Sequence, residues 1–306
     1  MLSDTRKQRR LFIAVGFIFL VVGSLASSTD TLIELTSTGY IRPVSHLFLI
    51  LTMLSVVIVG QRLLSLNPTW LLCYTSIPLG LIWSIQEFTV TLSDLSDVNQ
   101  LPNYVVNTML PVFVSGVGCA LAFFCMDEDE GSYISQDPKL LHIAILAAVP
   151  FIFIAGLTVS GLWAASIFWS VHPTLILLGC LLLGAGKRIK TASKTLREFS
   201  HGDIGFVLLD GGKVATFMGA LVTALFYIAL SRLDDPKTVG PMMALGLITI
   251  LMGCFVYLIG ICMSAVSSSP ELQRNLRLDS WHLAEAYAFV LLALLAPASI
   301  FEFVVQ

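Results

Sequence analysis

The chain has 306 residues, of which 56% are hydrophobic and 12% are charged, with a formal net charge of −3 and a mean hydropathy of +0.87. Soluble domains carry charge on about a quarter of their residues, so this composition excludes a water-soluble globular fold, and the negative net charge gives no reason to expect a nucleic-acid partner. We expect an all-α, polytopic integral membrane protein built as a helical bundle.

Long apolar stretches recur along the whole sequence, separated by short polar links. An α-helix needs about 20 apolar residues to cross a bilayer. We therefore predict about nine transmembrane helices in a single membrane domain over residues 1–306. The predicted spans are 11–27, 44–66, 69–93, 104–126, 139–164, 167–186, 213–232, 241–266 and 283–304. The first span, which follows a basic start, also fits a cleaved signal peptide, and we expect it to be retained as a helix.

The positions of lysine and arginine predict the orientation, because these residues concentrate in cytoplasmic loops. A cytoplasmic N-terminus leaves Arg42, Arg232 and Lys237 as the only outer cations among 17 lysines and arginines. Nine spans then place the C-terminus outside. We expect the cytoplasmic (inner) membrane of a bacterium.

Two segments that lie four spans apart share several residues. His46, Gly60 and Arg62 correspond to His172, Gly186 and Arg188 when the second segment is aligned with the first. An offset of four spans preserves orientation, so the match suggests a parallel repeat. Residues 11–126 and 139–266 would form the two four-helix units, and 283–304 an extra helix. Chance similarity between apolar helices is the alternative.

Ionisable groups within a bilayer are costly unless they are paired or hydrated, so those inside the spans are functional candidates. The outer-side candidates, with neighbouring aromatic residues, are Glu87, His172, Glu302, Trp83, Trp169 and His46. These side chains would line an outward-facing cavity that binds a solute, a cation or a quinone head group. The alternative is that they are ordinary interfacial anchors. A haem between His46 and His172 is less favoured, so the cofactor is left unknown.

Two polar pairs fall on the inner side. Asp210 with Lys213, and His282 with Glu285, have the spacing of neighbours on one helical face. Two ligands do not make a metal site, so we predict no metal centre and interpret these pairs as solvated helix ends or a weak binding site. Asp203 follows Ser200 near the seventh span, but an aspartyl protease needs a facing second aspartate, and span six contains none.

The favoured function is a transporter or channel-like permease for a small solute. The alternative is a membrane anchor subunit of a respiratory or redox complex that interacts with a quinone. An enzyme acting on lipids would need clustered acids or histidines, which the sequence lacks, so we lean against catalysis and predict no catalytic residue. Expected partners are the lipid bilayer, and other membrane subunits or a second copy of the chain.

The orientation can be tested with reporter fusions to the full upstream sequence. Alkaline phosphatase folds only outside the cytoplasm, so fusions within links 94–103 and 233–240 should be active. Fusions within 127–138 and 191–200 should be inactive. The opposite pattern in all four links would reverse the assignment.

Overall fold

The computed structural model describes residues 43–64, 66–93, 101–125, 140–159, 171–192, 196–230 and 239–264. Within these ranges the chain forms seven α-helices, one short 3-10 helix and no strand. The helices are α2 (Pro43–Leu64), α3 (Pro68–Ser93), α4 (Leu101–Cys125), α5 (Leu140–Val159), α6 (Val171–Ala192), η3 (Leu196–Glu198), α7 (His201–Leu230) and α8 (Val239–Ser264).

The predicted all-α class is confirmed for these ranges, and spans two to eight each correspond to one helix. The first and ninth spans, 11–27 and 283–304, lie outside the described residues, so the number nine stays a prediction. The seventh helix begins at His201, well before the apolar run that starts at residue 213. Hydropathy misses its first turns because they contain Asp203 and Asp210, whose charges are paired with α6.

Three of the described helices are long and apolar enough to cross a membrane: Leu47–Leu64, His201–Thr223 and Gly246–Ser264. Large apolar side chains also face outward along α2 and α6, among them Leu54 and Ile58 on α2 and Leu182 on α6, which is 66% exposed. Water would penalise such surfaces, whereas lipid chains would cover them. These helices therefore identify the chain as a membrane protein.

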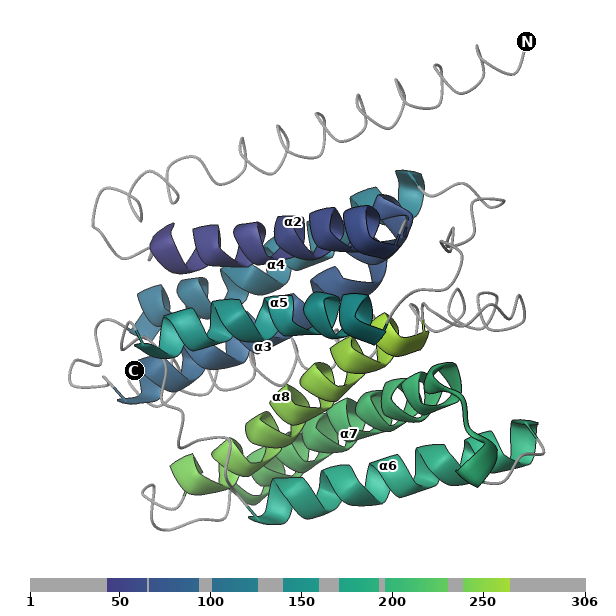
Figure 1. Ribbon diagram of the computed structural model, residues 1–306. Helices are drawn as coiled ribbons and strands as arrows, with labels where there is room; N and C mark the ends of the chain where they lie inside the picture. The colour runs from purple at the N-terminus through teal and green to yellow at the C-terminus, as the bar shows by residue number, and fades with distance from the viewer. Residues whose placement is uncertain are drawn as a thin grey trace.

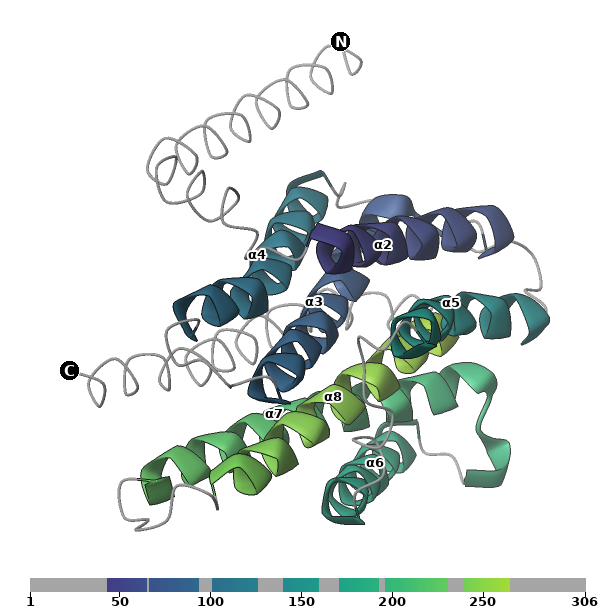
Figure 2. The same cartoon turned by 90° about the vertical axis from the view of Figure 1, so that its left-hand side faces the viewer.

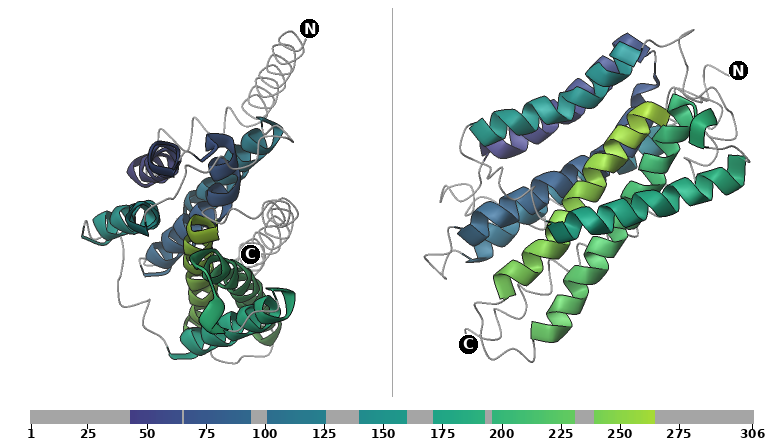
Figure 3. Two further views of the ribbon diagram at one scale, coloured as in Figure 1. Left: turned by 45° about the vertical axis from the view of Figure 1, so that its right-hand side comes forward. Right: turned by 60° about the horizontal axis from the view of Figure 1, so that its bottom comes forward.

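The helices form two groups that meet at α3 and α8 (Figures 1 and 2). In the first group α3 packs against α2 and α4, and α5 lies beside α2; the second view in Figure 3 shows α2 and α5 next to each other. In the second group α6 packs against α7 and α8. The helix α8 contacts members of both groups and holds them together.

Glycines at every seventh position bring α7 and α8 into backbone contact. The three pairs are Gly205 with Gly260, Gly212 with Gly253, and Gly219 with Gly246. A Cβ added at Gly212 would lie 2.6 Å from the backbone nitrogen of Tyr257 and 2.8 Å from the carbonyl oxygen of Gly253. Lipid supplies no hydrophobic force between helices, so close packing through small residues is what joins them. A seven-residue repeat keeps one face of each helix against the other.

The pair α3 and α4 is also closely packed. A Cβ at Gly80 would overlap the side chain of Ser115 on α4, and the sulfur atoms of Cys73 and Cys119 lie 3.9 Å apart. In both closely packed pairs the two helices are consecutive and run in opposite directions. In the chain, α2 precedes the pair α3 and α4, and α6 precedes the pair α7 and α8. The two four-helix units suggested by the sequence stay a prediction.

Replacing Gly212 with alanine should separate α7 from α8, because the new methyl group would meet backbone atoms that cannot rotate away. We expect a loss of about 1–3 kcal/mol in unfolding free energy, the usual cost of overpacking. Gly186→Ala is the matched control, since a Cβ there meets nothing within 4 Å. Thermal unfolding in detergent should show Gly212→Ala melting lower, and Gly186→Ala unchanged or higher because alanine favours helix. Equal melting of both variants would contradict the packing.

Candidate functional site

The helix α3 is enclosed on every side in its central part. From Cys73 to Glu87, about four helical turns, every side chain is buried. The neighbouring helices α2, α4 and α8 pack against α3 and form this enclosure. Figure 2 shows α3 running between α4 and α8. A helix in this position contacts little lipid, so its polar side chains are held within the protein.

Several polar side chains on α3 satisfy their hydrogen-bonding capacity locally. The hydroxyl of Thr75 donates to the carbonyl oxygen of Leu71 at 2.7 Å, and that of Ser76 donates to Leu72 at 2.6 Å. Ser115 on α4 donates in the same way to Val112 at 2.9 Å. Hydroxyl groups bonded back to their own helix can be buried at little cost. They show that polarity alone does not mark a site on these helices.

Gln86 differs from these hydroxyl groups. Its side chain is 2% exposed, and within the part of the chain that the structure describes neither Nε2 nor Oε1 has a hydrogen-bond partner. A side-chain amide has two N–H donors and a carbonyl acceptor. Burying them unpaired costs about 1–3 kcal/mol on mutational scales. A buried group left in this condition requires an explanation, and ligand binding is one.

Trp83 and Glu87, two of the outer-side candidates, flank Gln86 on α3. Trp83 is 0% exposed and Glu87 is 7% exposed. Trp83 lies one helical turn before both Gln86 and Glu87 and so shares a face with each, while the adjacent Gln86 and Glu87 leave the helix about 100° apart. A third outer-side candidate, His172, is exposed at the start of α6. The principal neighbours of α6 are α7 and α8. A cavity lined by all three stays a prediction.

The other outer-side candidates cannot be placed. His46 belongs to the first turn of α2, but its side chain lies outside the described set, and Trp169 and Glu302 lie outside the described residues altogether. The same holds for the inner pair His282 and Glu285. In the ranges that are described, no three His, Cys, Asp or Glu side chains come together as metal ligands.

The inner residues Asp210 and Lys213 each contact another helix. A carboxylate oxygen of Asp210 lies 2.9 Å from the ammonium nitrogen of Lys187 on α6, whose side chain is 68% exposed. The ammonium group of Lys213 lies over the ring of Tyr257 on α8, 5.8 Å from its centroid. Both residues therefore connect α7 to its neighbours. The ion pair with Lys187 already balances the charge of Asp210. The predicted pairing of Asp210 with Lys213 is therefore not required.

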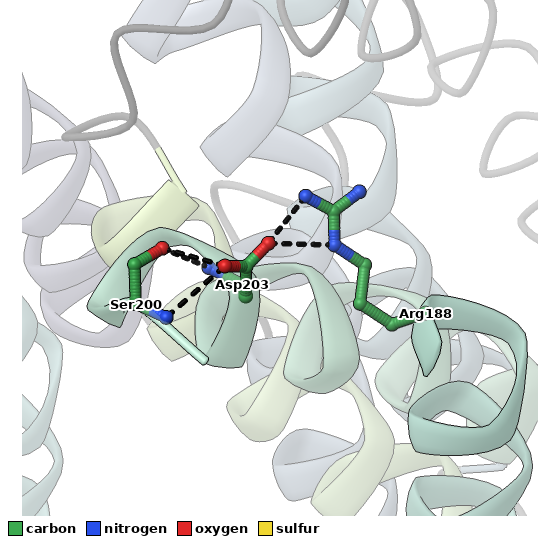
Figure 4. Close-up of polar contacts among 3 residues, drawn as sticks. All are labelled: Arg188, Ser200 and Asp203. Atoms are coloured by element: carbon green, nitrogen blue, oxygen red, sulfur yellow. Dashed lines mark hydrogen bonds and ion pairs between the residues drawn. The ribbon is translucent and has the colours of Figure 1, made fainter. Parts of the chain in front are cut away.

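A buried ion pair links α6 to the beginning of α7 (Figure 4). Arg188 donates from Nε and Nη2 to Oδ1 of Asp203 at 2.9 and 2.5 Å. The backbone N–H and hydroxyl of Ser200 donate to Oδ2 at 3.0 and 2.7 Å, and the Asp203 N–H donates back to that hydroxyl at 3.2 Å. Ser200 is thus the N-cap of α7 in a capping box.

This cluster has a structural role, because it joins α6 to the first turn of α7. Both oxygens of Asp203 accept hydrogen bonds, its side chain is 3% exposed, and the Arg188 guanidinium also lies 5.1 Å from the centre of the Phe206 ring. The segment from Ser200 to Asp203 is expected from the sequence to open span seven, whereas the ion pair is not predicted. The Ser-x-x-Asp spacing was a usable signal for the start, whereas nothing local in the sequence identifies Arg188 as the partner.

No protein-family model, curated protein or solved structure matches this chain.

Removing the carboxylate of Asp203 should be severely destabilising, because it leaves a largely buried guanidinium without its partner and the first turn of α7 without its cap. We expect Asp203→Ala to lower the unfolding free energy by about 3–5 kcal/mol. The control Asp210→Ala breaks a more exposed pair and should cost no more than about 1 kcal/mol. Chemical unfolding in detergent micelles compares the two, and similar losses would contradict the structural role assigned to Asp203.

Proposed function

We propose that this chain is a permease that carries a small solute across the membrane, with α3 supplying the polar groups that the solute contacts. The observation that carries the proposal is the pair Gln86 and Glu87, an amide and a carboxylate that are both buried in the enclosed helix. Side chains of this kind inside membrane helices are rare and expensive, and they mark solute or ion pathways.

The depth of these side chains supports the proposal. A helix of 26 residues is about 39 Å long at 1.5 Å per residue. If α3 is centred in a hydrocarbon layer about 30 Å thick, Gln86 and Glu87 lie roughly 8–10 Å from the midplane. Both would therefore lie within the hydrocarbon layer, between its centre and its outer boundary.

Proline residues inside three helices also favour a pathway through the first group. Pro78 lies within α3, Pro111 within α4 and Pro150 within α5. Each removes one backbone hydrogen bond from its helix, and transporters commonly build their sites from interrupted helices. Pro78 and Pro111 lie on the closely packed pair that contains Gln86 and Glu87.

We further propose that the end of the bundle bearing Arg62, Lys187, Lys190 and Arg197 faces the cytoplasm. Arg62 and Lys190 lie in the last turns of α2 and α6, and Arg197 lies in η3, just before α7. This placement agrees with the concentration of cations on the cytoplasmic side. It puts Glu87 and Gln86 in the outer half, in the inner membrane of a bacterium as the sequence suggests. A redox-complex anchor has no observation of its own in its favour.

The proposal predicts solute flux through vesicles that contain only this protein. In an osmotic shrinking assay with urea, glycerol, methylammonium and acetate, the protein should raise the rate for at least one solute above that of empty vesicles. Glu87→Gln, which keeps the shape of the side chain, should lower that rate about tenfold, as expected for losing a hydrogen bond to a charged group. The exposed Glu198→Gln is the control. Rates equal to those of empty vesicles for all four solutes would exclude this function for these solute classes.

A further inference from the structure

Gln86 points to the chemical class of the solute. We propose that its side-chain amide is a binding group for a small neutral solute that both donates and accepts hydrogen bonds, such as an amide or a polyol. This inference deepens the proposed function and rests on it for the claim that the solute is transported. Binding of the solute at Gln86 does not depend on transport, because it is inferred from the burial of the amide and its lack of a described partner.

Burial of the Gln86 amide without a described partner carries an energetic cost. Its neighbours on α3 show that this helix can bury polar groups without cost, because Thr75 and Ser76 bond to their own backbone. A glutamine amide is too long to make that bond easily, and within the described residues both of its polar atoms lack a partner. A methionine or leucine would fill the same volume without the penalty. The amide therefore reduces stability, which is expected where a group is retained for binding.

The geometry of the Gln86 amide also restricts the solute. Oε1 accepts and Nε2 donates, and the two atoms lie side by side in one plane. A solute that carries its own adjacent donor and acceptor can satisfy both atoms at once. A solute with acceptors only, or donors only, would leave one of the two buried atoms unpaired and lose the corresponding free energy.

The charge in this half of the bundle favours a neutral solute. Among the described residues, Glu87 is the only acidic side chain in the outer half, and no lysine or arginine lies there. An anion would enter a region with one negative charge and no described cation, so anions are disfavoured. A cation that offers donors only would satisfy Oε1 of Gln86 and leave its buried Nε2 unpaired. A neutral solute avoids both costs.

Two measurements with the full-length protein test this inference. Gln86→Met is the test variant. Gln61→Met is its matched control, because Gln61 is an exposed glutamine on α2. In detergent without added solute, Gln86→Met should melt at a higher temperature than the wild type and Gln61→Met should not. A lower melting temperature for Gln86→Met would show that the amide has a partner in the folded protein and would overturn the site.

Binding and flux are then measured with acetamide, glycerol, methylammonium and acetate. Saturation-transfer NMR should detect acetamide or glycerol on the wild type and on Gln61→Met, with the signal lost in Gln86→Met. Vesicle flux of the same solute should fall about tenfold in Gln86→Met. Loss of binding with no wild-type flux would keep the site and overturn the permease. Flux that does not depend on Gln86 would keep the permease and overturn the site, and Gln86-dependent binding of acetate or methylammonium instead would overturn the neutral class.

Discussion

Contact between the backbones of α7 and α8 is the interaction on which the rest of the structure depends. Hydrocarbon cannot hydrogen-bond to a peptide group, so each spanning segment must be a helix, and helices in lipid must then associate through close packing. Glycine at Gly205, Gly212 and Gly219, facing Gly246, Gly253 and Gly260, permits that approach along about four turns of helix. The helix α8 also contacts α3, α5 and α6, so the position of this pair determines where both helix groups lie.

Charge at one end of the bundle complements this packing. The two ion pairs between α6 and α7 differ in their surroundings: Arg188 and Asp203 are largely buried, whereas Lys187 is exposed beside Asp210. Both carboxylate oxygens of Asp203 accept hydrogen bonds, one from Arg188 and the other from Ser200. Because these bonds are directional, they fix the direction in which α7 begins. The glycines then allow α7 and α8 to approach closely along their lengths. The buried ion pair positions the first turn of α7 against α6.

The enclosed helix α3 joins structure to function. Packing by its neighbours removes the side chains from Cys73 to Glu87 from lipid, which allows polar groups to lie at a depth where lipid would exclude them. Two of these groups, the hydroxyls of Thr75 and Ser76, bond within their own helix. Gln86 does not, because neither of its polar side-chain atoms has a hydrogen-bond partner among the described residues. Stability and the proposed binding site are thus in opposition at this residue.

The sequence by itself determined the helical membrane class and the approximate limits of spans two to six and eight, because apolar length is a property of a continuous segment. The sequence also contains the heptad spacing of glycine on α7 and α8 and the Ser200 capping box. Both are local patterns, and the structure shows which contacts they make. Only the tertiary structure decided that Asp203 pairs with Arg188, that Asp210 pairs with Lys187, and that Gln86 is buried without a described partner. These outcomes depend on which distant segments come into contact, and apolar helices of similar composition do not encode that choice in any single segment.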